Sequence, residues 1–165
     1  MNLEEIGIFK NRIVSKLIHD NNVVDVLLNG NEGDKDPEIA LLGSDEAGTD
    51  GCVFEFEYVP DTQETSKTFL CVEVIPEETS GDTITGMSVY VFAYCSKNIM
   101  QTYHRKGTAG TRIDILISDI DKILNGNQEF GIGPLEWAGS DIYKPAQIYY
   151  GRMIVYRANT FRRPR

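Results

Sequence analysis

The stretch GTRIDILISDIDKILNG, residues 110–126, carries the pattern that is most informative about the fold. At 100° per residue its aliphatic side chains fall on one arc of a helix, which predicts that they are buried together. Thr111 and Asp114 have the spacing of a capping box, and Gly126 follows as a C-cap. The arc consists of Ile113, Leu116, Ile117, Ile120, Ile123 and Leu124.

The three aspartates of this helix do not converge on one point. Asp114 and Asp121 lie beside each other at one edge of the arc, whereas Asp119 lies well round from them. We therefore interpret them as a solvated face and expect no metal to bind there. Ile115 points away from the arc, next to Asp119 on the helical wheel. Single exposed apolar residues are common, but on a helix this strongly patterned Ile115 is also a candidate for a subunit interface.

The composition is that of an ordinary globular chain. Its 165 residues are 41% hydrophobic and 25% charged, enough for one domain with a proper core. The N-terminus is acidic and amphipathic, so we expect no signal peptide, and no apolar run is long enough to span a membrane. The three cysteines are odd in number and far apart. We expect them to be small core residues in a reducing cytosol, without a disulfide framework or a metal site.

Charge is unevenly distributed along the chain. Residues 32–82 contain fifteen acidic residues against two lysines, a local balance of −13, whereas residues 152–165 contain five arginines and no acid. A basic end can contact nucleic acid, but the acidic body would repel it. The simpler interpretation is that copies of the protein meet with the arginine end of one on the acidic loops of the next, because charge complementarity sets the register of such contacts.

Helical and strand periods divide the chain into two kinds of segment. Residues 3–19 have apolar side chains at helical spacing, and residues 21–30 predict a short second helix. From residue 52 the period changes to two: Phe54, Phe56 and Tyr58 alternate with acidic residues, which predicts a half-buried antiparallel strand over 52–60. The intervening loop 29–38 lacks the ligand order of a calcium site.

Later strands complete the pattern. Residues 68–76 predict a strand followed by an acidic loop, and GMSVYVFAYC, residues 86–95, is apolar on both faces, as in a central strand. Two closing strands are expected within 130–139 and 146–161. Gly151 lies in the middle of the last one, where a glycine marks a bulge or a close approach of another backbone.

The order of elements indicates an α+β fold with a mainly antiparallel sheet and two helices packed on one face. We expect a single domain over residues 1–165. The other face of the sheet carries Glu55, Glu57 and Glu73, which suits solvent or a lumen. The expected parts are helices in 1–30, strands in 51–97, a helix in 110–125, closing strands in 129–161 and a basic tail in 162–165.

Catalytic motifs are missing from the sequence. The serine of GSDEAG does not have the position of a nucleophile elbow. KGTAGT lacks the lysine of a phosphate-binding loop, and in GIGPLE a proline stands where a helix should begin. Paired glutamates on an exposed strand are more simply a solvent face than an acid–base pair. We therefore expect neither enzymatic activity nor a cofactor.

The aromatic and basic ending, IYYGRMIVYRANTFRRPR, raises the question of nucleic-acid binding. Tyrosines interleaved with Arg152 and Arg157 are able to stack on single strands. Against this, Tyr150 and Tyr156 share strand parity with core residues, and the isoelectric point of the chain is about 4.7. The alternative to a subunit of a larger assembly is therefore a stand-alone module that holds nucleic acid or an acidic protein through its C-terminus.

The arrangement resembles the tail-terminator and head–tail joining (neck) proteins of long-tailed bacteriophages. The likeness rests mainly on GMSVYVFAYC, TRIDILISDIDKILNG, GIGPLEW and YYGRMIVYRANTF, in that order. It implies a virion protein, assembled in the host cytoplasm as a hexameric ring, with helices outward and sheets toward a channel. The implied partners are other copies, the tail tube and the neck or head-closure proteins. DNA passes through without specific binding, and Glu55, Glu57 and Glu73 line the channel.

Together with the charge imbalance, this resemblance leads to a specific expectation about the subunit contact. Arg152, Arg157, Arg162 and Arg163 are expected to face acidic loops of an adjacent subunit, drawn from residues 55–64 and 73–82. The alternative is that RRPR is a solvated tail without a partner.

Overall fold

The computed structural model of the chain describes residues 3–28, 37–44, 49–60, 67–131 and 133–159. Its helices are α1 (Glu5–Ile18), α2 (Asn21–Leu28), α3 (Pro37–Leu42) and α4 (Arg112–Leu124), with a short 3-10 helix, η1 (Lys97–Ile99). The strands are β1 (Gly43–Ser44), β2 (Thr49–Asp50), β3 (Val53–Phe54), β4 (Thr68–Ser80), β5 (Thr83–Ser96), β6 (Glu136–Tyr143) and β7 (Tyr149–Asn159).

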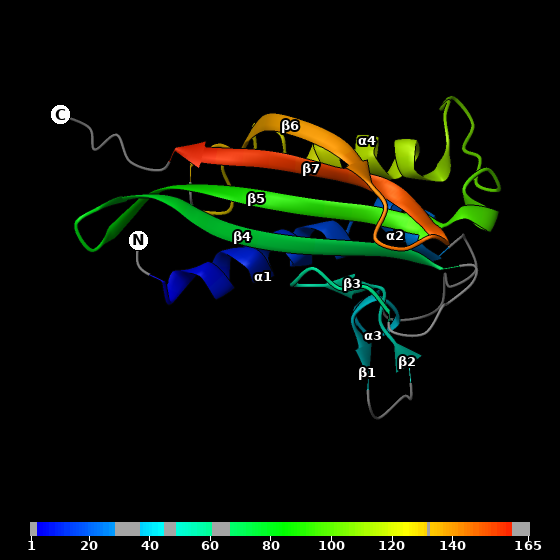
Figure 1. Cartoon of the computed structure of the whole chain (residues 1–165), viewed down its shortest axis with the longest axis horizontal. Coiled ribbons are helices and arrows are strands. Elements are labelled where there is room, and N and C mark those ends of the chain that lie inside the picture. The colour runs from blue at the N-terminus through cyan, green and yellow to red at the C-terminus, as the bar shows by residue number, and fades with distance from the viewer. Residues whose placement is uncertain (1–2, 29–36, 45–48, 61–66, 132, 160–165) are drawn as a thin grey trace.

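One sheet organises the molecule. Its strand order is β3-β4-β5-β7-β6, and every pairing is antiparallel except that of β3 with β4, while β1 and β2 form a separate small ribbon. The helices α1, α2 and α4 pack against β4, β5 and β7, and no helix of the described residues covers the other face of the sheet (Figure 1). The predicted α+β class is confirmed. We call the two sides the helical face and the open face.

Local signals explain where the helices begin. The α1–α2 break is stabilised by Asp20, whose carboxylate accepts the N–H groups of Asn22 at 3.0 Å and Val23 at 3.1 Å, as an N-cap does. The capping box predicted for α4 is present, with Thr111 and Asp114 exchanging hydrogen bonds. Gly126 follows α4 with φ of 77°, which suits glycine after a helix end.

The prediction of a central strand over 86–95 is confirmed. The strand β5 lies in the middle of the sheet, and both of its faces are buried over most of its length. Gly151 of β7 is a close approach, because a Cβ there would lie 1.9 Å from the carbonyl oxygen of Ala93. All three cysteines are buried in the core, as expected, and their thiols are free.

Three predicted strand boundaries are wrong. Residues 52–60 form only the two-residue strand β3, which is parallel to β4, because the rest of the segment folds onto the aromatic side chains of the open face. The expected acidic loop after β4 is instead strand up to Ser80, since Gly81 with φ of 60° allows a tight turn into β5. The strand expected within 130–139 begins only at Glu136.

Ile115 was expected to be exposed, and this is wrong: its side chain is 4% exposed and belongs to the core. The reason is that α4 is covered on two sides. The sheet packs on the predicted apolar arc, and α2 packs on α4 as well. Arg112, Ile115 and Asp119, spaced one turn apart, are all buried. Ile115 is therefore a core residue and is withdrawn as an interface candidate.

None of the described helices has both the length and the apolar character needed to cross a membrane.

Candidate functional site

A buried polar network fixes the segment before α4 against α2. Asp119 is 4% exposed, and both of its carboxylate oxygens lie 2.9 Å from Nη1 of Arg105. The other arginine nitrogen, Nη2, donates to the carbonyl oxygen of Asn22 in α2 and to the hydroxyl of Tyr103, which itself donates to Asp25. The prediction that Asp119 lies on a solvated face is therefore wrong. Its carboxylate is buried and forms an ion pair with Arg105.

Arg112 is the largest fully buried side chain among the described residues. Its Nη1 donates to the carbonyl oxygen of Val26 in the last turn of α2, and Nε donates to that of Ile99, both at 3.1 Å. A cation is favourable at the C-terminal end of a helix, where carbonyl groups are left without helical partners. Burial lowers the pKa of Arg112. Sequence reasoning missed this residue, because an arginine in the first turn of an amphipathic helix is ordinarily expected to face solvent.

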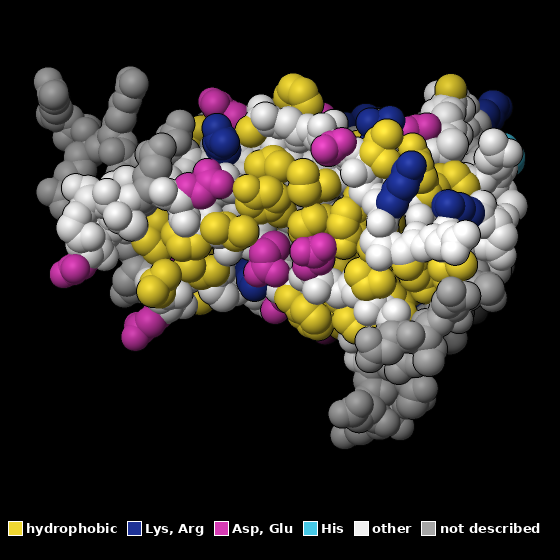
Figure 2. Space-filling model, in the orientation of Figure 1, with side chains coloured by type: hydrophobic (Ala, Val, Ile, Leu, Met, Phe, Trp, Pro, Cys, Tyr) yellow, Lys and Arg dark blue, Asp and Glu magenta, His cyan; other side chains and the backbone are white. Residues whose placement is uncertain are grey.

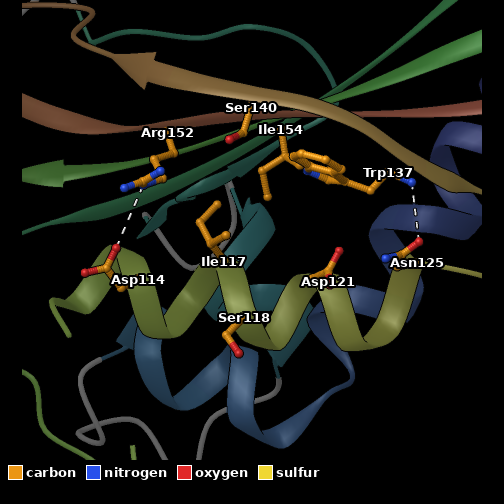
Figure 3. A pocket seen from close by; sticks show the side chains of 9 residues that line it. All are labelled: Asp114, Ile117, Ser118, Asp121, Asn125, Trp137, Ser140, Arg152 and Ile154. Atoms are coloured by element: carbon orange, nitrogen blue, oxygen red, sulfur yellow. Dashed lines mark hydrogen bonds and ion pairs between the residues drawn. The ribbon is translucent and has the colours of Figure 1, made fainter. Parts of the chain in front are cut away.

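A groove runs between α4 and the overhanging strands β6 and β7 (Figure 3). Its volume is about 600 Å³. Ile117 of α4 and Ile154 of β7 point toward each other and form its apolar part, and the indole of Trp137 lies next to Ile154. The remaining lining residues are polar: Asp114, Ser118, Asp121, Asn125, Ser140 and Arg152. We call this feature the α4 groove.

The strand that roofs the α4 groove is the outer edge of the sheet. Trp137 and Ile142 of β6 are 56% and 53% exposed. The N–H group of Trp137 donates to Asn125 Oδ1 at 3.3 Å, and that of Ile142 to Oδ1 of Asp141 at 2.7 Å. A register shift between Trp137 and Gly139 interrupts the ladder as well. Occupied N–H groups and an interrupted ladder hinder the pairing of an edge strand with another strand. A partner of β6 would therefore contact its side chains more than its backbone.

Two of the predicted interface arginines already have acidic neighbours within the chain. Arg152 in the α4 groove has Nε 3.8 Å from Asp114 Oδ1, and Arg157 has Nε 3.7 Å from Glu77 Oε2. Both arginines remain partly exposed, at 44% and 62%. Arg162 and Arg163 lie outside the described residues.

The three predicted channel glutamates separate into two groups. Glu57 and Glu73 meet on the open face, where the N–H of Glu57 donates to Glu73 Oε2 and the hydroxyl of Tyr143 donates to Glu57 Oε1. Glu55 is turned toward α1, and its Oε1 accepts a hydrogen bond from Asn11. Lys10 of α1 pairs with Glu73 at 3.3 Å.

The open face is apolar at its centre and carries several acids (Figure 2). The register places Glu73, Tyr90 and Val155 across three adjacent strands on this face. Arg157 and Glu77 meet across β5 from the strands on either side of it, and Tyr90 donates to Glu77 at 3.3 Å. Other apolar members are Phe56, Ile75, Phe92, Tyr143 and Met153, of which Phe56 and Ile75 are 52% and 43% exposed.

Reactive side chains are few in the part of the chain that the structure describes. Burial raises the pKa of Cys52, Cys71 and Cys95 to about 12, which keeps them as thiols. Burial, together with the hydrogen bond to Asp121, raises the pKa of Tyr156. Among the described residues no group of three or more His, Cys, Asp or Glu side chains is placed to hold a metal ion.

Comparison with known protein families identifies a match for most of the chain. The YomW family matches residues 20–158, from just before α2 to the penultimate residue of β7. No curated protein and no solved structure matches the chain. The match includes α4, β6 and β7, which form the α4 groove, and the whole β4–β5 hairpin. The chain belongs to the YomW family, a phage-derived family, and is therefore a phage-associated protein.

Proposed function

We propose that the chain is a structural subunit of a ring at the neck or tail end of a phage particle. The observation that carries the proposal is that the sheet extends beyond the helices that cover it. At one edge, β6 presents Trp137 and Ile142 beside the α4 groove. At one end, the β4–β5 hairpin continues past the last residue of β7 (Figure 1). Exposed apolar side chains beside a groove mark surfaces that other proteins cover.

The phage origin of the family and the order of the elements support the same proposal. The expected neighbours are further copies of the chain, the tail tube and the neck or head-closure proteins, with assembly in the host cytoplasm. Glu57 and Glu73 on the open face remain the candidates for a channel wall. Negative side chains in a lumen repel DNA phosphates, so that DNA slides without sticking. Each of the three predicted glutamates has a partner within the chain: Asn11 for Glu55, Tyr143 for Glu57 and Lys10 for Glu73.

Mass in solution and negative-stain microscopy test the proposal. Light scattering of the purified chain is expected to give a multimer, and images are expected to show closed rings. The alternative function, a stand-alone module, predicts a monomer that shifts single-stranded nucleic acid in a gel. A monomer at all protein concentrations would contradict the ring.

A matched pair of substitutions tests the edge of the sheet. Ile142 of β6 and Ile8 of α1 are the same residue type and are 53% and 51% exposed. If β6 lies at a subunit contact, Ile142→Ser weakens assembly while Ile8→Ser leaves it unchanged. Equal effects of the two changes would show that β6 is not the contact.

A further inference from the structure

We propose that the turn of the β4–β5 hairpin in one copy docks into a hollow at the opposite end of the sheet in the next copy. The inference rests on the proposed assembly function and names the contact that repeats through it. The occupant is thus a second copy of this chain.

The docking element is the tip of the hairpin, residues 79–83. The last residue of β7 pairs with Gly86, and among the described residues the hairpin beyond that point pairs only with itself. The tip side chains are exposed, and a Cβ on Gly81 would meet nothing within 4 Å. Asp82 is exposed at the turn itself. The two strands of the tip thus pair with each other, and the exposed side chains of the tip are accessible to a second copy.

The receiving hollow lies where β5 ends and β7 begins. It has a volume of about 310 Å³ and is lined by Lys97, Asn98, Met100, Gln101 and Tyr150. The Nζ of Lys144 lies 5.5 Å from the centre of the Tyr150 ring, so a second cation stands beside the hollow. Lys97 and Lys144 are both exposed. The hollow thus combines the side chains of Met100 and Tyr150 with one lining cation, Lys97, and a second cation, Lys144, lies beside it.

The two elements have complementary chemistry. Asp82 is an exposed anion at the tip, whereas Lys97 lines the hollow and Lys144 lies beside its Tyr150. Thr83, which pairs with Ser80 and shares its face of the hairpin, offers a methyl group that suits methionine and tyrosine. The antiparallel topology fixes the hairpin turn and the hollow at opposite ends of β5, whose residues run from 83 to 96 (Figure 1). One copy is therefore unable to satisfy the contact with its own tip.

Geometry makes this a head-to-tail contact. Two different surfaces meet, so each copy offers a tip to one neighbour and a hollow to the other. Such a contact forms a ring if the rotation between copies closes and an open filament if it does not. Single exposed ion pairs are weak, so the contact gains strength from repetition and is sensitive to salt, whereas reversal of one charge replaces attraction with repulsion.

A charge swap tests the contact. Asp82→Lys and Lys97→Glu, each made singly, are expected to weaken assembly by about tenfold, as a change of about 1.4 kcal/mol does. The double variant restores the attraction and is expected to recover much of the loss. Lys122→Glu on α4 makes the same charge change at another exposed position and is expected to assemble like the parent. Assembly is measured by light scattering across a salt series, with circular dichroism to verify the fold.

Cross-linking provides a readout that does not depend on affinity. Asp82→Cys combined with Gln101→Cys is expected to give disulfide-linked multimers on a non-reducing gel, whereas Asp82→Cys with Lys122→Cys is not. If the parent forms rings, but the charge-changed variants assemble equally well and the cysteine variants do not cross-link, the docking proposal is overturned. The proposed function is then unaffected. Cross-linked open chains without rings support the docking contact and overturn the ring. A parent that stays monomeric and does not cross-link overturns both.

Discussion

Nη1 of Arg105 lies 2.9 Å from both carboxylate oxygens of Asp119, and this ion pair joins the segment before α4 to the helix itself. The arginine side chain is 22% exposed and the aspartate 4%. The pair is thus removed from most of the solvent, unlike the exposed pair of Arg157 and Glu77 on the open face. This difference in exposure gives the first prediction.

Arg105→Ala is expected to lower the free energy of unfolding by about 3 kcal/mol, because it leaves Asp119 buried without its charge partner. The double variant with Asp119→Ala is expected to lose less than the sum of the single losses. Arg157→Ala is the control and should cost about 0–1 kcal/mol. Urea unfolding monitored by circular dichroism measures the parent, both single variants, the double variant and the Arg157→Ala control. Additive single losses would show that the two side chains do not act as a pair.

Core truncations on α4 test the finding that this helix is covered on two sides. Leu116→Ala and Ile120→Ala remove side chains that face the sheet and should each cost about 2–5 kcal/mol. Ile115→Ala is expected to fall in the same range, since its side chain is equally enclosed. The control is Ile142→Ala on the exposed edge. If Ile115→Ala melted at the same temperature as the parent, the side chain of Ile115 would not be buried in the core.

Two glycines in neighbouring strands make a matched pair. Gly151→Ala places a methyl group 1.9 Å from the carbonyl oxygen of Ala93, and the strand must shift at a cost of about 1–3 kcal/mol. A Cβ on Gly139 meets nothing within 4 Å, so Gly139→Ala is expected to be neutral or slightly stabilising. Thermal unfolding compares the two variants. Equal stabilities would mean that β5 and β7 are further apart than described.

Alkylation of the cysteines tests their burial. The reactive form is the thiolate, and a pKa of about 12 leaves Cys52, Cys71 and Cys95 protonated at pH 8. Iodoacetamide at that pH is therefore expected to modify none of them in the folded chain and all three in denaturant. Intact mass distinguishes the two outcomes. Rapid modification without denaturant would contradict the closed core.

Fluorescence of Trp137 reports on the α4 groove. This residue is the only tryptophan of the chain and is 56% exposed. Its emission is expected to be that of a water-exposed indole in the monomer and to shift to shorter wavelength if assembly covers the groove. The dependence of the emission on protein concentration measures this, with Trp137→Phe as the blank. An unchanged spectrum in a multimer would place the contacts elsewhere.

Where a pattern is local, the sequence was a sufficient guide. The helix over residues 112–124, its capping box and the central strand over 86–95 all follow from spacing. At Gly151 the sequence left a bulge and a close approach open, and the structure shows the close approach. The α+β class follows in turn from the order of these segments.

The tertiary structure alone decided which side of each element is covered. Ile115 and Asp119 are spaced to face solvent on a helix with one buried arc, but α2 closes that side, and Arg105 supplies the charge that makes a buried carboxylate tolerable. The α4 groove and the receiving hollow likewise combine residues far apart in the chain. Periodicity reports how a segment alternates about its own axis, whereas burial depends on what packs against it, and that information lies in other segments.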